Sequence, residues 1–298
     1  MSYIDLLKTS AQGAGNCACM GIDPNFSALP DGFGVEKFFC TILNSLDKAN
    51  IKLGAIKPNI GYFSCLDQPL RNSFEGSLAL VGIIKALPCR PLILDAKRGD
   101  IATSSANYAH EAFSCWSADA VTVSPYMGSD SVSPFTQPIV APCAETPSQD
   151  AAQPRGQGIY VLNRTSNPGG KDLQNQVMAD GRPVYMHVAD LIAKWNTTYS
   201  ASIGAVVGAT NLKEFEDLAA YYADKSVPLL IPGVGSQGGS AADVIAIMRR
   251  VGYPLELCRI NSSSALTHPW AKQHQAAPAN WKDVCLDAIK KFAEECAL

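Results

Sequence analysis

Eight short apolar segments recur along the chain, and longer stretches of mixed polarity separate them. Most of these segments are apolar at nearly every position, so both faces of a strand formed from them would be buried. Strands buried on both faces are typical of a parallel sheet that is covered by helices. The predicted strands are 17–23, 54–60, 91–97, 120–126, 158–164, 203–210, 229–235 and 257–263.

The stretches between these segments have helical periodicity. Residues 35–46 carry an apolar stripe with a spacing near 3.6 residues. Residues 71–87 form a second candidate helix, whose core-facing side chains we expect to be Leu78, Val81 and Ile84. Asn211 is expected to cap a further helix, another is predicted over 240–251, and the last covers about 280–296.

Eight strand–helix units in 298 residues predict an α/β fold of the (β/α)8 TIM-barrel type. No linker or internal repeat divides the chain, so we expect one domain over 1–298, which can stand alone or form part of a longer fused chain. Residues 134–157 contain five prolines, which predict a short or broken fourth helix and a long loop.

The composition excludes several classes of partner. The net charge is −3 and no basic stripe is present, so we expect no nucleic-acid binding. The first ten residues lack the pattern of a signal peptide, and no apolar segment is long enough to cross a membrane. Ten cysteines are scattered without a CxxC pair, and four histidines lack metal-binding spacing. We therefore predict a cytoplasmic protein with buried cysteines and no metal site.

Charged residues gather where three of the predicted strands end. Asp23 ends the first strand, Lys57 lies in the second, and Asp95, Lys97 and Asp100 end the third. Active sites of TIM barrels lie at this end of the strands, and residues two apart in a strand share a face. A solvated loop with ordinary surface charges is the alternative, but the apolar run before Asp95 argues against it. The pattern predicts a cluster of mutually neutralising charges.

A glycine-rich segment, 233–239, follows the seventh strand, and the polar run 261–264 follows the eighth. Glycine-rich turns at these positions of a barrel commonly bind phosphate through backbone N–H groups. Glycines also simply close tight turns, so this segment alone leaves both interpretations open.

Four motifs follow one another along the chain: IKPN at 56–59, LDAKRGDI at 94–101, RTSNPGG at 164–170 and IPGVGSQGG at 231–239. Together they resemble those of orotidine 5′-monophosphate (OMP) decarboxylases, whose Asp-x-Lys-x-x-Asp signature is matched by LDAKRGDI. The combination resembles the longer subfamily with the DAKRGD and RTSNP motifs. The signature alone is less specific, because related decarboxylases and aldolases of ketose phosphates share it.

The resemblance implies decarboxylation of OMP to UMP and CO2, the last step of UMP biosynthesis, without a cofactor. Lys57, Asp95, Lys97 and Asp100 would form a charged tetrad. In this family pattern Lys97 would donate a proton to C6 of the pyrimidine, and Asp95 would lie beside the departing carboxylate. Asp100 would reach into the site of a second subunit, which implies a homodimer with shared active sites.

The resemblance also implies a set of substrate contacts. Asp23 and Lys57 would contact the ribose, Ser166 the pyrimidine ring, and Gln237 would bridge toward the phosphate. Ile101 and Ser104 would extend across the dimer interface and contact the substrate in the other subunit's site. The remaining expected substrate-binding residues are Gly238, Asn261 and Ser263.

One position departs from the family pattern. Most members carry a phosphate-binding arginine after the eighth strand, whereas this chain has serines there. Ser263 and Ser264 with backbone amides could replace the arginine, or Arg155 or Arg164 could supply the charge.

Two other functions remain as alternatives. A magnesium-dependent ketose-phosphate decarboxylase or aldolase would use the same barrel, but its second strand typically offers an acidic metal ligand where this chain has Lys57. A non-catalytic phosphate-ligand-binding barrel would have little need of the tetrad. The family occurs both alone and fused to orotate phosphoribosyltransferase, so such a fusion partner is a further expectation.

Overall fold

Eight parallel strands form the centre of the computed structural model, which describes residues 1–87, 91–137, 156–199, 202–235 and 237–298. All eight predicted strands are present. Their bounds are β1 Ala18–Ile22, β2 Ala55–Pro58, β3 Ile93–Arg98, β4 Ala120–Val123, β5 Gly158–Arg164, β6 Ser202–Val207, β7 Leu229–Ile231 and β8 Cys258–Ser262.

The strand order makes the sheet a barrel. The order is β2-β1-β8-β7-β6-β5-β4-β3, so β2 and β3 are its two ends. These ends meet through two isolated parallel bridges, Ile56 with Leu92 and Asn59 with Asp95. The predicted TIM barrel is therefore confirmed, with a seam between β2 and β3 that consists of two isolated bridges rather than a continuous ladder.

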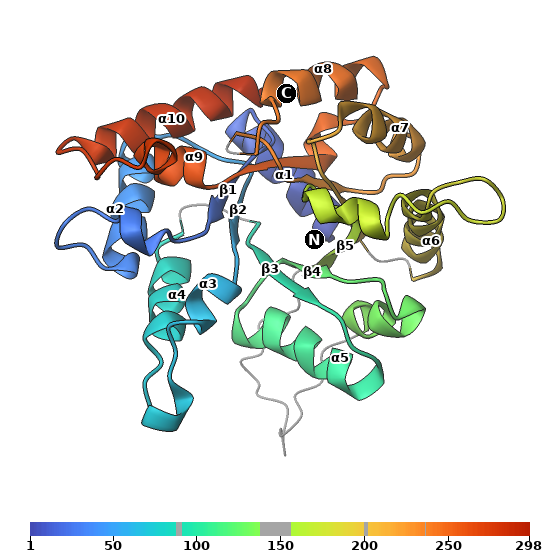
Figure 1. Cartoon of the computed structure of the whole chain (residues 1–298), viewed down its shortest axis with the longest axis horizontal. Helices are drawn as coiled ribbons and strands as arrows, with labels where there is room; N and C mark the ends of the chain where they lie inside the picture. Colours follow the sequence, from blue (N-terminus) through green and yellow to red (C-terminus); the bar gives the residue numbers. More distant parts are fainter. Residues whose placement is uncertain (88–90, 138–155, 200–201, 236) are drawn as a thin grey trace.

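Helices surround the barrel (Figure 1). Their bounds are α1 Tyr3–Ala14, α2 Val35–Lys48, α3 Gly61–Ser64, α4 Glu75–Lys85, α5 Ala102–His110, α6 Val184–Thr198, α7 Leu212–Tyr222, α8 Ala241–Arg250, α9 Ser264–Thr267 and α10 Trp281–Glu295. Asn211 caps α7 as predicted, because its side chain accepts a hydrogen bond from the amide of Glu214. Ser240, predicted as the first residue of a helix, instead caps α8 by accepting from the amide of Asp243. No described helix combines the length and apolar character needed to cross a membrane.

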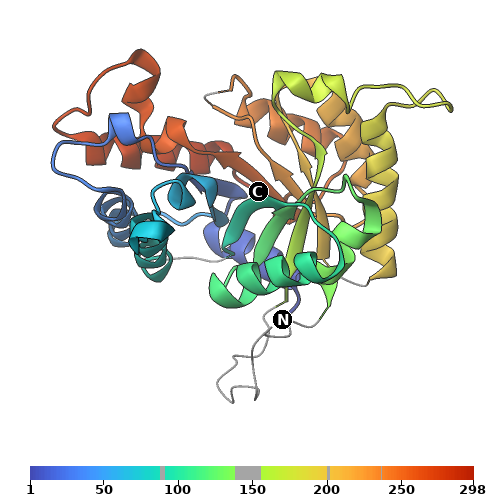
Figure 2. The ribbon, with the colours of Figure 1, turned by 60° about the horizontal axis from the view of Figure 1, so that its bottom comes forward.

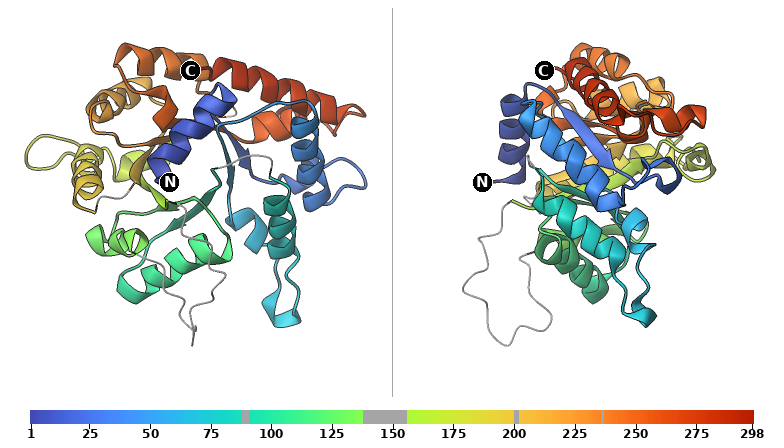
Figure 3. Two further views of the ribbon diagram at one scale, coloured as in Figure 1. Left: turned by 180° about the vertical axis from the view of Figure 1, so that it is seen from behind. Right: turned by 90° about the vertical axis from the view of Figure 1, so that its left-hand side faces the viewer.

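Two of the three core-facing side chains predicted for the helix over 71–87 are wrong, and only Ile84 packs against the core. Leu78 is 65% exposed and Val81 is 37% exposed, while Leu80 and Ile83 are buried. The helix begins only at Glu75, after a projecting arm that contains a 3-10 turn, and it packs against α2 and α3 (Figures 1 and 3). Because the helix is apolar nearly all round, its periodicity did not determine which face turns inward.

Two further expectations concern loops and cysteines. After β4, the described residues form only the 3-10 turns Gly128–Ser131 and Ser133–Thr136, and most of the predicted long loop lies outside the described residues. Among the described cysteines, five are buried as predicted, but Cys65 and Cys115 are exposed. Both lie in segments outside the barrel strands, where an apolar environment is not imposed.

The amino-terminal end of the barrel is closed by α1, which lies across the opening when the molecule is seen from behind (Figure 3). Tyr3 and Leu7 of α1 are buried among the inward-facing residues of the strands. The hydroxyl of Tyr3 donates to that of Tyr160 on β5 at 3.1 Å. The guanidinium of Arg259, fully buried, donates to the carbonyls of Leu7 and Gly54. This closed end leaves the opposite, carboxyl end of the strands for a site.

His268 is buried among aromatic rings from α2 and the segments after β8. Its imidazole stacks on Phe38 with ring centres 4.9 Å apart, and Nδ1 lies 2.9 Å from the hydroxyl of Thr267. Burial lowers the pKa of His268 to about 4. The imidazole is therefore neutral in the folded protein at neutral pH.

We expect the stability of the protein to fall between pH 6.5 and pH 4. In the unfolded chain His268 becomes protonated near pH 6.5, whereas in the folded chain it becomes protonated only near pH 4. The free energy of unfolding should therefore fall by about 2–3 kcal/mol over this range. Urea unfolding of the wild type and of His268→Phe at pH 7.5 and pH 4.5 measures this difference. An equal loss of stability in the two proteins would contradict the assignment.

Candidate active site

A cavity of about 1030 Å³ opens at the carboxyl ends of the strands. It brings together eight of the twelve residues that the sequence predicted for the site. They are Asp23, Lys57, Asp95, Lys97, Ser166, Gln237, Asn261 and Ser263. These residues come from six different strands or the loops that follow them, as the barrel geometry requires.

Three charged residues form the centre of this site. The carboxylate of Asp95 accepts from Lys57 Nζ through Oδ2 at 2.8 Å and from Lys97 Nζ through Oδ1 at 2.5 Å. Lys57 and Asp95 are almost completely buried, whereas the side chain of Lys97 is half exposed. The predicted neutralising cluster is thus present, and Lys97 is the ammonium in it with free access to the cavity.

The charges determine the protonation states. Burial alone would lower the pKa of Lys57, but attraction by Asp95 and Asp23 outweighs it and raises that pKa above its ordinary value. Burial alone would raise the pKa of Asp95, but the two lysines outweigh it and hold that pKa well below its ordinary value. Asp95 is therefore ionised and Lys57 protonated throughout the physiological range.

Two buried oxygens at the cavity have no hydrogen-bond partner among the described residues. They are Oδ1 of Asp23, at the end of β1, and Oδ1 of Asn261, on β8. A buried polar atom without a partner is costly, and such atoms commonly receive a hydrogen bond from a ligand. Hydroxyl or amide donors of a bound ligand could satisfy both oxygens.

Four of the predicted residues lie outside the cavity lining. Asp100 accepts a hydrogen bond from the amide of Ile101 at 2.8 Å and forms no ion pair with the described lysines. Ile101 immediately precedes α5 and Ser104 lies in its first turn, and both are exposed. Gly238 has φ of 94° and donates its amide to the carbonyl of Gly235, so it serves the turn. Within one subunit, Lys57, Asp95 and Lys97 thus meet without Asp100.

The loop after β7 is a tight turn that depends on glycine. Gly233, Gly235 and Gly238 all have positive φ, and the amides of Gly235, Gly238 and Gly239 bond to carbonyls within the loop. Gln237 extends from this turn to the cavity wall. The glycines are therefore needed for the turn itself, whatever ligand the loop binds.

Arg164 does not supply the missing phosphate-binding charge. Its guanidinium is buried and bonded to Glu214 at 2.7 Å and to the carbonyl of Thr165 at 2.6 Å. Arg155 lies outside the described residues, and the amide of its neighbour Gly156 bonds to the carbonyl of Met1. Of the cavity's described lining residues, only Lys57 and Lys97 are cationic.

Thr122 is a residue of this site that was not predicted from the sequence. This residue of β4 is 1% exposed, lines the cavity, and donates to Asp95 Oδ1 at 2.9 Å. A lone hydroxyl in the apolar strand AVTV was the available signal, because an isolated polar residue on a buried strand needs a partner. The same pattern also occurs where threonine simply packs, so the signal alone is weak.

The fold and the charge cluster define the chain as a TIM barrel with a metabolite site at the carboxyl ends of its strands. Residues 20–250 match the model of the orotidine 5′-phosphate decarboxylase / HUMPS family, and the chain belongs to this family. Among curated relatives, the orotidine 5′-phosphate decarboxylase of Delftia acidovorans is 37% identical over 274 residues, which cover 90% of each chain.

Solved structures agree in fold. A putative orotidine 5′-phosphate decarboxylase from Streptomyces avermitilis is 29% identical with a TM-score of 0.73, over 99% of this chain and 94% of that one. The UMP synthase of Leishmania donovani is 29% identical with a TM-score of 0.72, over 98% of this chain and 56% of that one. The barrel thus has a counterpart inside a longer protein.

Proposed function

We propose that this chain decarboxylates OMP to UMP and CO2 with Lys97 as the proton donor. The family match and curated relatives that span nearly its whole length confirm the predicted decarboxylase activity and its place in pyrimidine biosynthesis. The observation that supports the residue roles is the carboxylate of Asp95 held between two ammonium groups at the cavity. The roles themselves are our proposal.

The reaction needs electrostatic help at one carbon. When the bond between C6 and the carboxylate breaks, CO2 leaves and the electron pair stays on C6 in the plane of the ring, where no ring position delocalises it. The ammonium of Lys97 stabilises this pair as it develops and then transfers a proton to it, forming UMP. Asp95 keeps the Lys97 ammonium oriented through their ion pair, and it repels the substrate carboxylate before that group leaves.

The rest of the substrate supplies binding energy. We propose that Asp23 and Lys57 bind the ribose and that Ser166 and Asn261 contact the pyrimidine. Gln237, Ser263 and Ser264 would bind the phosphate through amide and hydroxyl groups, because the described lining offers no arginine there. The barrier reduction required is roughly 20 kcal/mol, more than one ion pair supplies, so binding of the remote phosphate must help to organise the site.

The second subunit completes the proposed site. Asp100 and Ile101 lie beside the carboxyl end of β3 but outside their own cavity. We propose that a homodimer places Asp100, Ile101 and Ser104 in the partner's site. We also propose that the protein is cytoplasmic. We propose further that it associates with an orotate phosphoribosyltransferase, in one chain or as a separate protein.

We expect activity on OMP to survive exhaustive chelation. Lys57 occupies the position on β2 where a magnesium-dependent relative typically has an acidic ligand, and its ammonium repels a cation. No group of three metal-binding side chains gathers in the described part of the chain. Loss of UV absorbance on adding OMP, with and without EDTA, measures this. A strict magnesium requirement, restored by adding the ion back, would favour the ketose-phosphate alternative.

A further inference from the structure

The pairing of β3 with β4 is interrupted beside the site. Leu94 pairs with Val121 and Arg98 with Val123, so residues 95–97 of β3 face the single residue Thr122 of β4. Such an irregularity leaves backbone amides of the longer segment without carbonyl partners on the neighbouring strand. Because residues 95–97 include both Asp95 and Lys97, the interruption lies in the segment that positions the proposed catalytic charges.

The hydroxyl of Thr122 takes the place of the missing backbone partners. Its Oγ1 accepts hydrogen bonds from the amides of Ala96 at 3.0 Å and Lys97 at 2.9 Å. The same hydroxyl donates to Asp95 Oδ1 at 2.9 Å. A hydroxyl has one proton to donate and two lone pairs, so these three bonds use its full capacity.

The hydrogen bond from the Lys97 amide to Thr122 stabilises an unusual backbone conformation at Lys97. Its φ is 46°, in the left-handed region that a residue with a Cβ atom rarely adopts. This turn directs Lys97 Nζ to Asp95 Oδ1, the same oxygen that Thr122 binds. One hydroxyl thus contacts the backbone of the proton donor and the carboxylate that orients it.

We propose that Thr122 is the positioning residue for the Lys97 ammonium and the Asp95 carboxylate. It acts through these two residues, by fixing the turn at Lys97 and the rotation of the Asp95 carboxylate. The proposal rests on the proposed roles of Lys97 and Asp95, and it adds a requirement for a hydroxyl at position 122. A threonine that only packed in the barrel would be replaceable by valine.

Paired substitutions test the hydroxyl. Thr122→Val keeps the shape and removes the hydroxyl, whereas Thr122→Ser keeps the hydroxyl. We expect kcat to fall about 100-fold in the valine variant, with KM and the Kd for UMP within a few-fold, because a small misplacement of a reacting group costs this much. The serine variant should remain within a few-fold of wild type. Thr122→Ala is measured alongside, so that the test stands if the valine variant does not fold.

A matched control separates positioning from stability. Tyr253, in the segment after α8, is buried and does not line the cavity, and its hydroxyl donates to the carbonyl of Val227 at 2.6 Å. Tyr253→Phe removes one buried hydroxyl hydrogen bond, so it should lower the melting temperature and leave kcat unchanged.

Each outcome decides the proposal. Wild-type kcat in Thr122→Val or Thr122→Ala overturns it and leaves the proposed function standing. Equal losses in the serine and valine variants, parallel to their melting temperatures, also overturn it, because the role would then be structural. Full activity in Lys97→Ala would instead overturn the proton-donor role itself. Loss in the valine and alanine variants with rescue by serine supports the proposal.

Discussion

Replacing Lys97 with alanine is expected to lower decarboxylation of OMP by at least about 10⁴-fold, because the change removes both the stabilising charge and the acid. Lys97 is the half-exposed ammonium at the cavity, whereas Lys57 is buried against Asp95. The variant should stay folded, since Lys57 still neutralises Asp95. The UV assay measures the loss, and circular dichroism and the melting temperature check the fold.

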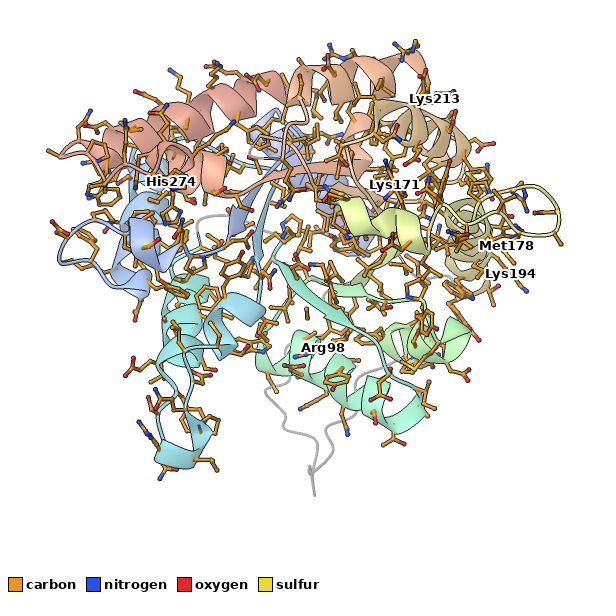
Figure 4. All side chains as sticks on the ribbon, viewed as in Figure 1. Arg98, Lys171, Met178, Lys194, Lys213 and His274 are labelled. Atoms are coloured by element: carbon orange, nitrogen blue, oxygen red, sulfur yellow. The ribbon has the colours of Figure 1, made fainter. Side chains whose placement is uncertain are left out.

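A second lysine provides the control. Lys213 on α7 is 77% exposed and pairs with Asp217 at 2.7 Å, and it lies on the outer side of the molecule, away from the strands (Figure 4). Lys213→Ala also removes one lysine–aspartate ion pair and should keep full activity. If Lys97→Ala retained a tenth of wild-type activity, its assignment as proton donor would be wrong.

Mixing two inactive variants, Lys97→Ala and Asp100→Ala, is expected to restore activity to about a quarter of wild-type sites. In a mixed dimer with shared sites, one site carries both lesions and the other carries neither. Random pairing at equal concentrations makes about half of the dimers mixed, and each has one intact site. The geometric reason is that Asp100 lies outside the cavity of its own subunit.

The control for this experiment combines two substitutions that affect the same subunit's contribution to the site. Lys57 and Lys97 line one cavity of one subunit. A mixture of Lys97→Ala with Lys57→Ala, whose fold is checked by circular dichroism because the Lys57–Asp95 pair is buried, should stay inactive, since every site of a mixed dimer carries one lesion. Subunit exchange is followed independently with differently tagged chains. Exchange without recovery in the Lys97/Asp100 mixture would place Asp100 in its own subunit's site.

The sequence predicted the barrel and the centre of the site for one reason. Strand ends of a barrel converge, so Lys57, Asp95 and Lys97 could be placed together from their positions at the ends of apolar runs. The same reasoning brought Asp23 and Asn261 to the cavity. Here position along the chain determines position in space, because neighbouring strands follow one another around the barrel.

Other features depend on contacts that the chain does not encode locally. Thr122 acts through an interruption of strand pairing that no periodicity reveals. Arg164 is bound to Glu214, a residue fifty positions away, so its availability could not be judged from its motif. Leu78 and Val81 face outward because helix packing, rather than apolar spacing, selected the inward face of α4.

The projecting segments are a further limit of sequence reasoning. Residues 173–183 extend from the body as a long loop, with Val177 bridged to Pro183 and 69% exposed (Figure 2). The sequence of this loop has no strong strand or helix pattern, so its shape could not be predicted.

The seam between β2 and β3 ties the folding of the barrel to its chemistry. Lys57 lies on β2 and Asp95 on β3, so their ion pair joins the two ends of the sheet where few backbone bonds do. Removing one partner of a buried pair costs about 3–5 kcal/mol, so substitutions at either residue endanger the fold as well as the reaction. In many enzymes, substitutions at active-site residues raise stability at the cost of activity. In this barrel stability and activity depend on the same ion pair between Lys57 and Asp95. Attempts to change the substrate range therefore have more freedom at the other residues that line the cavity than at these two.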